Sequence, residues 1–285
     1  MKSKIILRLL LVALASLALL GGCASLDEKQ REWIFQPSDR TWAGGLAAAE
    51  GMSDVWIPFK SPSSGEDVRL HGLWLAADKP GAPVLLYLHG ARFDVRGSAP
   101  RMRRMQELGF SVLGIDYRGF GQSSKTLPSE AMAYEDARAA WDWLAQQYPQ
   151  AQRYVFGHSL GGAIAVQLAS QVQQQAAGLI VEGSFTSIPE VVSSFKWGWL
   201  PVSPLITQRF EAGERIGSLK MPVLIVHGSA DSLIPPALGR ALFDRAPEPK
   251  RFVLVEGGSH HNTNAVGQPL YREALAELFG LRPGR

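Results

Sequence analysis

A serine flanked by glycines lies between an apolar run and a helical pattern in the middle of the chain. The segment Gly157-His158-Ser159-Leu160-Gly161-Gly162 follows Tyr154-Val155-Phe156, and an alanine-rich helical pattern continues to Val172. In a sharp turn between a strand and a helix, a serine hydroxyl stands clear of the backbone. The residues two before and two after it are squeezed together and need to be glycine. The helix that starts there points its amide N–H groups at the serine and favours developing negative charge. The pattern predicts Ser159 as a catalytic nucleophile, and the alternative is a Gly-rich structural turn.

A nucleophilic serine needs a histidine that takes its proton, and three histidines follow Ser159 in the chain. His227 ends an apolar run and is interpreted as a packing residue at a strand end. His260 and His261 lie in a Gly-rich loop after the last apolar run, where a base at the carboxyl edge of a sheet can reach the serine. His260 is the predicted base because the glycines before it provide the turn that aims the first histidine inward. His261 stays as the alternative.

The histidine in turn needs a carboxylate that orients it. Asp231 lies a few residues beyond the strand-like run that ends at His227, a spacing that suits a hydrogen bond to the imidazole. Glu182 ends the preceding apolar run and is the competing candidate. Either carboxylate could instead cap a helix or a turn. Asp231 is the predicted acid.

Acyl transfer also needs two hydrogen-bond donors for the oxyanion. The predicted donors are the backbone N–H of Leu160, directly after the serine, and that of Ala91, in the loop after the apolar run 84–88. His89 is interpreted as holding this loop, without a role in proton transfer. The Arg92 side chain is an alternative donor, against its interpretation as a surface arginine.

A segment of about residues 184–221 is rich in aromatic residues and lacks a strand pattern. We interpret it as a lid insertion in which Phe195, Trp197 and Trp199 line an apolar substrate pocket or dip into lipid. The alternative is that these aromatic side chains pack on the body of the domain, and one segment can do both.

The pattern of residues at the amino terminus predicts an export signal. A basic start is followed by an apolar stretch, residues 5–20, and then by Gly21-Gly22-Cys23. Such a stretch is too short for a convincing transmembrane helix. The segment 20–23 resembles the bacterial lipobox, so that Cys23, the one cysteine of the chain, is the predicted lipidation site at the start of the mature protein. An ordinary signal peptide is the alternative. Ala24 resembles the residue at that position in lipoproteins of the outer membrane, which predicts its periplasmic face as the location.

Removal of residues 1–22 takes away Lys2, Lys4 and Arg8, so Lys plus Arg falls from 29 to 26, against 26 Asp plus Glu. The basic isoelectric point therefore belongs to the export signal and gives no indication of a nucleic-acid partner. The sequence has no His/Cys cluster with metal-ligand spacing and no phosphate-binding loop, so neither a metal nor a cofactor is expected.

Residues 23–50 are predicted to form a tether that packs partly on the rest, and residues 51–285 suffice for one α/β domain. Apolar runs alternate with helical patterns, which predicts a mostly parallel eight-stranded sheet flanked by helices, with ligands at its carboxyl edge. The predicted strands are residues 55–59, 68–75, 84–88, 111–115, 154–156, 179–181, 223–226 and 252–255, and the clearest helices are 130–147 and 161–172.

The chain resembles the α/β-hydrolases over nearly all of residues 51–285, and within them the short-cap branch of serine-aminopeptidase-type and monoacylglycerol-lipase-like hydrolases and depalmitoylating esterases. The resemblance implies a serine hydrolase for esters or thioesters with a hydrophobic acyl group, acting through an acyl-enzyme. The alternatives are an aminopeptidase or amidase and a non-catalytic envelope lipoprotein. Two loops depart from the family pattern: Ala91-Arg92 stands where Asn-Ala is frequent, and a second histidine follows His260. The residues that carry the resemblance are Leu88-His89-Gly90, residues 115–123, residues 157–162, residues 182–187, Asp231 and His260.

Overall fold

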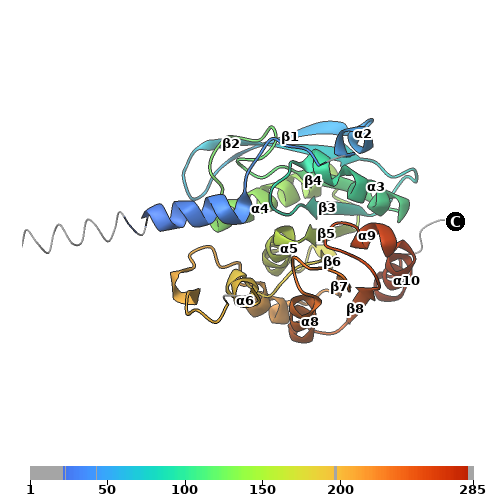
Figure 1. Ribbon diagram of the computed structural model, residues 1–285. Coiled ribbons are helices and arrows are strands. Elements are labelled where there is room, and N and C mark those ends of the chain that lie inside the picture. Colours follow the sequence, from blue (N-terminus) through green and yellow to red (C-terminus); the bar gives the residue numbers. More distant parts are fainter. Residues whose placement is uncertain (1–21, 23, 43, 196–197, 282–285) are drawn as a thin grey trace, which may run out of the picture.

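The computed structural model describes residues 22, 24–42, 44–195 and 198–281, and an eight-stranded sheet forms its centre (Figure 1). The strand order is β1-β2-β4-β3-β5-β6-β7-β8. The first two pairings are antiparallel, and every pairing from β4 onward is parallel. The strands are β1 (Ser53–Lys60), β2 (Asp67–Leu75), β3 (Val84–Leu88), β4 (Ser111–Ile115), β5 (Arg153–His158), β6 (Ala176–Glu182), β7 (Val223–Gly228) and β8 (Lys250–Val255).

Helices cover both faces of this sheet, because the central strands are apolar on both sides. On β3, Leu86 and Leu88 pack with α4 (Glu130–Gln147) and α5 (Leu160–Gln171), whereas Leu85 and Tyr87 pack with α3 (Ala99–Glu107) and α10 (Gln268–Phe279). The longer helices are α3 (Ala99–Glu107), α4 (Glu130–Gln147), α5 (Leu160–Gln171), α8 (Pro236–Arg245) and α10 (Gln268–Phe279). The shorter ones are α2 (Gly45–Ala49), η1 (Val95–Ser98), α6 (Ile188–Ser193), η2 (Ser203–Leu205), α7 (Ala212–Arg215), η3 (Ile216–Ser218) and α9 (Thr263–Val266).

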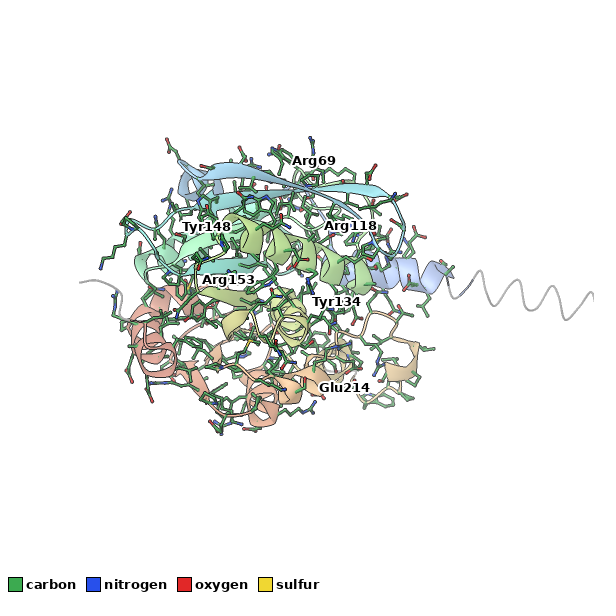
Figure 2. The ribbon with its side chains drawn as sticks, turned by 180° about the vertical axis from the view of Figure 1, so that it is seen from behind. Arg69, Arg118, Tyr134, Tyr148, Arg153 and Glu214 are labelled. Carbon is green, nitrogen blue, oxygen red and sulfur yellow. The ribbon has the colours of Figure 1, made fainter. Side chains whose placement is uncertain are left out.

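The loop after β4 ties several elements together through buried charges. Asp116 accepts hydrogen bonds from the backbone N–H of Val95, at 2.6 Å, and from His71 Nδ1, at 2.8 Å. Arg118 lies beside α4 (Figure 2), and its Nε donates to Asp136 Oδ1 at 2.8 Å. Hydrogen bonds to charged groups are among the stronger ones, so this loop fixes the position of the segment between β3 and α3.

The amino-terminal segment is part of the folded body. Residues 24–35 are helical and lie beside the loop that leads to η2, at one end of the molecule (Figures 1 and 2). Phe35 is fully buried and packs edge-to-face on Phe210, with ring centroids 5.7 Å apart. The predicted tether therefore contains a helix that is docked by an apolar anchor.

The predicted fold class, a mostly parallel eight-stranded sheet with flanking helices, is confirmed. Strand boundaries differ from the predicted ones by a few residues, chiefly because β5 and β6 continue to the polar residues His158 and Glu182 at the sheet edge. No helix within the described residues is long and apolar enough to cross a membrane.

Candidate active site

Ser159 occupies a tight turn between a strand and a helix. It follows the last residue of β5 and precedes the first residue of α5, and its φ of 57° lies in the left-handed region. A Cβ atom on Gly157 would overlap the backbone of Gly161, so the chain can close this turn only with glycine. The backbone N–H of Ser159 donates to the carbonyl of Glu182 at 2.9 Å, which holds the turn against β6.

The three side chains that the sequence predicts as a catalytic set lie in one hydrogen-bonded row. Ser159 Oγ is 3.0 Å from His260 Nε2, and His260 Nδ1 is 2.8 Å from Asp231 Oδ2. Asp231 lies in the loop after β7 and His260 in the loop after β8. Because carboxyl ends of parallel strands share one edge of a sheet, these loops meet at the turn after β5.

The Asp231 carboxylate is held in place and kept ionised. Its Oδ1 accepts hydrogen bonds from the backbone N–H groups of Leu233, at 3.0 Å, and Ile234, at 2.8 Å. Burial raises its pKa, but hydrogen bonds from His227 and His260 and the charge of His260 outweigh this effect, so the pKa lies well below its usual value. An ionised carboxylate accepts from Nδ1–H of His260, which leaves Nε2 as the acceptor for the serine proton.

Two further histidines flank His260 without joining this row. His158 donates through Nε2–H to the carbonyl of His260 at 3.0 Å. Burial and the nearby charges of Arg101 and His260 hold the pKa of His158 well below its usual value, so its ring is neutral. His261 stacks on Trp42, with centroids 5.0 Å apart. His158, for which no sequence pattern predicts a role, supports the backbone of the candidate base.

Glu182, the alternative acid, points to a different partner. Its Oε1 accepts from Arg101 Nε at 2.9 Å, and its Oε2 accepts from the Tyr271 hydroxyl. Glu182 is buried, and burying a carboxylate requires a positive partner such as this one. Its side chain therefore joins β6 to α3 and α10, while Asp231 is the carboxylate beside His260.

The predicted oxyanion donors belong to two segments that meet at Ser159. A Cβ on Gly90 would lie 3.0 Å from Ser159 Cβ, so a glycine lets the loop after β3 approach the serine closely. Within the described residues, the backbone N–H groups of Ala91 and Leu160 have no hydrogen-bond acceptor. His89 donates through Nδ1–H to the Gly90 carbonyl at 2.6 Å. Two unused donors next to a nucleophile are the arrangement that an oxyanion requires.

The amino-terminal segment braces this loop, a feature that the sequence analysis missed. Arg92 has a backbone φ of 84°, a conformation that residues other than glycine rarely adopt. Its N–H donates to the Phe35 carbonyl at 3.0 Å, and its carbonyl accepts from the Ser38 hydroxyl. The N–H of Asp94 donates to the Arg40 carbonyl at 3.0 Å. Contacts over such sequence separations have no local signature, so no pattern in the sequence indicated them.

A cavity of about 420 Å³ opens beside Ser159 and His260, and its lining is rich in arginine. Arg92, Arg101 and Arg104 all contribute to it. Arg101 is paired with Glu182, whereas no carboxylate of the described residues lies within ion-pairing distance of Arg92 or Arg104. Burial and the charge of Arg101 lower the pKa of Arg104. The cavity therefore presents positive charge next to the serine.

The lid aromatics are placed elsewhere. Phe195 and Trp199 are absent from the lining of this cavity, and 44% of Phe195 and 73% of Trp199 is exposed. The prediction that they line the substrate pocket is wrong for the described cavity, because α3 and the loop after β3 form its walls. Trp197 and Cys23 lie outside the described residues.

The sheet, the turn at Ser159 and the row of hydrogen bonds at the carboxyl edge define the class of the α/β-hydrolases. A family described as serine aminopeptidase, S33, matches residues 79–214. An uncharacterised protein of Mycobacterium tuberculosis is 34% identical over 94% of this chain and 93% of its own length. The lysophosphatidylserine lipase ABHD12 of Danio rerio is 33% identical over 70% of this chain, which spans 61% of that protein.

A solved structure gives the same result for the fold. The esterase Pf2001 of Pyrococcus furiosus superposes with a TM-score of 0.67 at 19% identity, covering 87% of this chain and 97% of that one. The chain belongs to the α/β-hydrolase superfamily, and it is a hydrolytic enzyme.

Substitution of the nucleophile and of the base tests the hydrogen-bonded row. Ser159→Ala and His260→Ala should each lower ester hydrolysis by about a thousandfold or more, because both act in one proton transfer. Ser159→Ala should also abolish labelling by a fluorophosphonate. His261→Ala is the matched control and should keep most of the activity. Labelling that survives in Ser159→Ala, or an inactive His261→Ala beside an active His260→Ala, would contradict the assignment.

Substitution of the two carboxylates, Asp231 and Glu182, should have different effects on the enzyme. Asp231→Asn should leave a stable protein whose kcat is lower by about a thousandfold or more, because the amide favours the wrong imidazole tautomer. Glu182→Gln should chiefly lower the melting temperature, since breaking a buried ion pair costs about 3–5 kcal/mol. The measurements are kcat and thermal unfolding of both variants. A stable Glu182→Gln with the larger loss of kcat would identify Glu182 as the acid.

Proposed function

We propose that this chain is a membrane-anchored serine esterase that cleaves carboxylic esters or thioesters with a hydrophobic acyl group. The observation that carries the proposal is the row from Ser159 Oγ to His260 Nε2, at 3.0 Å, and from His260 Nδ1 to Asp231 Oδ2, at 2.8 Å. Such a row, with the serine in an elbow and two free N–H donors beside it, suits nucleophilic acyl transfer.

In this mechanism Ser159 Oγ attacks the ester carbonyl while His260 Nε2 takes the hydroxyl proton. Asp231 stabilises the imidazolium that forms, and the N–H groups of Leu160 and Ala91 bind the oxyanion. His260 then gives its proton to the leaving oxygen or sulfur, and the acyl group stays on Ser159. A water molecule, deprotonated by His260, attacks the acyl-enzyme, and the serine leaves with the returned proton.

The charge of the cavity favours an ester that also carries an acidic group. Arg92 and Arg104 would be the residues that meet it, because guanidinium groups bind carboxylate and phosphate well. The name of one relative, a lysophosphatidylserine lipase, refers to an ester of this kind, since lysophosphatidylserine carries a phosphate group. An aminopeptidase needs a carboxylate for the free amine of its substrate. The described residues that line the cavity include no carboxylate, and the buried carboxylates Asp231 and Glu182 are bound to His260 and Arg101. This supports the esterase over the aminopeptidase.

The anchor is proposed from the sequence around Cys23. A basic start, an apolar stretch and Leu20-Gly21-Gly22-Cys23 support lipidation of this cysteine in a bacterial cell envelope. With Ala24 next in the chain, the location that we propose is the periplasmic face of the outer membrane.

A panel of substrates tests the specificity. Esters of medium-chain acyl groups should be hydrolysed much faster than aminoacyl p-nitroanilides. Arg104→Gln should raise KM about tenfold for a 1-acylglycerol phosphate, because one charge-assisted hydrogen bond contributes about 1.5 kcal/mol. It should leave hydrolysis of the matching uncharged monoacylglycerol unchanged. Arg103→Gln is the control, since that guanidinium donates to the carbonyls of Ala48 and Glu50. Faster cleavage of the anilides would overturn the proposal in favour of an aminopeptidase.

Anchoring is tested at Cys23. Expressed in a bacterial host, the chain should yield a mature amino terminus at Cys23 that carries acyl chains, and Cys23→Ser should lose both the acylation and the cleavage. Mass spectrometry of the amino-terminal peptide decides the matter. An unmodified cysteine, or cleavage at another residue, would refute the lipid anchor.

A further inference from the structure

The amino-terminal helix and the lid are joined at one end of the molecule. Gln30 Nε2 donates to the carbonyl of Leu205 at 2.8 Å, and the N–H of Thr207 donates to Gln30 Oε1 at 2.8 Å. Asp27 accepts from the Thr207 hydroxyl at 2.7 Å and from Gln208 Nε2 at 2.8 Å. Both views show the helix and the lid side by side (Figures 1 and 2). The two segments therefore form one surface.

Large apolar side chains are exposed on both parts of this surface. Leu26, Gln30 and Trp33 are spaced so that they share one side of the helix, and Gln30, like Asp27, contacts the lid. Leu26 and Trp33 therefore flank the junction on the helix. Leu205 lies at the same junction on the lid, and Trp199 and Leu200, a few residues earlier in the lid, are also exposed. Single exposed apolar residues are ordinary, but a group of them from two joined segments indicates a contact surface.

We propose that this apolar end, defined by Leu26, Trp33, Trp199, Leu200 and Leu205, docks on a lipid bilayer. The inference rests on the membrane location in the proposed function and is independent of the chemistry. The apolar stretch 5–20 and Cys23 directly precede Ala24, where the described helix starts. A lipid on Cys23, or the stretch itself if it stays attached, brings the helix and the joined lid to the bilayer. Tryptophan and leucine are the residues that bury well in the interface of a bilayer.

The basic residues Lys29, Arg31 and Arg209 near the apolar end are each paired with an acidic residue, which points to contact by burial. Arg31 lies 3.7 Å from Asp27 and Lys29 lies 2.6 Å from Glu32 on the helix. On the lid, Arg209 is paired with Glu211 at 2.6 Å. Because opposite charges are adjacent, the electrostatic attraction of this surface to anionic lipids is weak. Binding should therefore occur on neutral bilayers and respond weakly to salt.

The test is the binding of residues 24–285, which lack Cys23 and its lipid, to phosphatidylcholine vesicles. This chain keeps every described strand and helix, and its folding is checked by thermal unfolding and by hydrolysis of p-nitrophenyl acetate. We expect it to co-float with the vesicles, with a partition coefficient that changes less than threefold on adding phosphatidylglycerol or 0.5 M salt. Trp199→Ser combined with Leu205→Ser should lower the partition coefficient at least tenfold and leave acetate hydrolysis unchanged.

The control substitutes two exposed apolar residues elsewhere, Leu254→Ser with Leu270→Ser, and should bind as the unaltered chain does. No binding to neutral vesicles, or equal binding of the lid variant and the unaltered chain, would overturn the docking proposal. So would a chain that is dimeric by light scattering and becomes monomeric in the lid variant, because a second copy would then cover this surface. If vesicle binding follows the expectation but esters are not cleaved, the catalytic proposal fails and docking stands. The lipid anchor is tested separately, by mass spectrometry, and an unmodified Cys23 would refute it.

Discussion

The backbone conformation of Ser159 is the constraint on which the rest of the site depends. A φ of 57° is costly for a residue with a side chain, roughly 1–3 kcal/mol, and persists only where surrounding contacts enforce it. Here the N–H of Ser159 is bonded to the Glu182 carbonyl, and Gly157 and Gly161 allow the start of α5 to lie against the ends of β5 and β3. This turn points the serine out of the sheet edge, where loops after β7 and β8 can reach it. The strain is thus offset by pairing and packing at the centre of the sheet.

Charge is distributed around this turn so that two buried carboxylates have separate tasks. Glu182 is neutralised by Arg101 and joins the sheet to the helices on one face, while Asp231 is fixed by backbone N–H groups and faces His260. Burial and the positive charge of Arg101 lower the pKa of His158, which stays neutral and donates to the His260 backbone carbonyl. The site therefore contains one imidazole, that of His260, that is hydrogen-bonded to a carboxylate, and one, that of His158, that is hydrogen-bonded to a backbone carbonyl.

The fold and the residues of the hydrogen-bonded row could be predicted because their signals are local. Ser159, Asp231 and His260 each follow an apolar run within a few residues, and parallel strands bring such positions to one edge. The walls of the cavity could not be predicted, since Arg104 lies on a helix whose charged residues look like a solvated face. The aromatic composition of the lid predicts a pocket wall or a lipid-facing surface without distinguishing them from packing on the body, because composition shows that apolar surface exists and gives no information on which side it faces.

The amino-terminal segment connects the proposed membrane location of the protein to its active site. Its helix bonds to the lid through Gln30, and at its end Phe35 is buried and its carbonyl holds the N–H of Arg92, next to the proposed oxyanion donor Ala91. Arg92 keeps its left-handed conformation only while Phe35 and Ser38 bind its backbone on both sides. A segment that only tethered the domain would need neither contact. The region that precedes the sheet therefore shapes the site itself, and a bilayer that bound the helix would act on the same element that holds the loop beside Ser159.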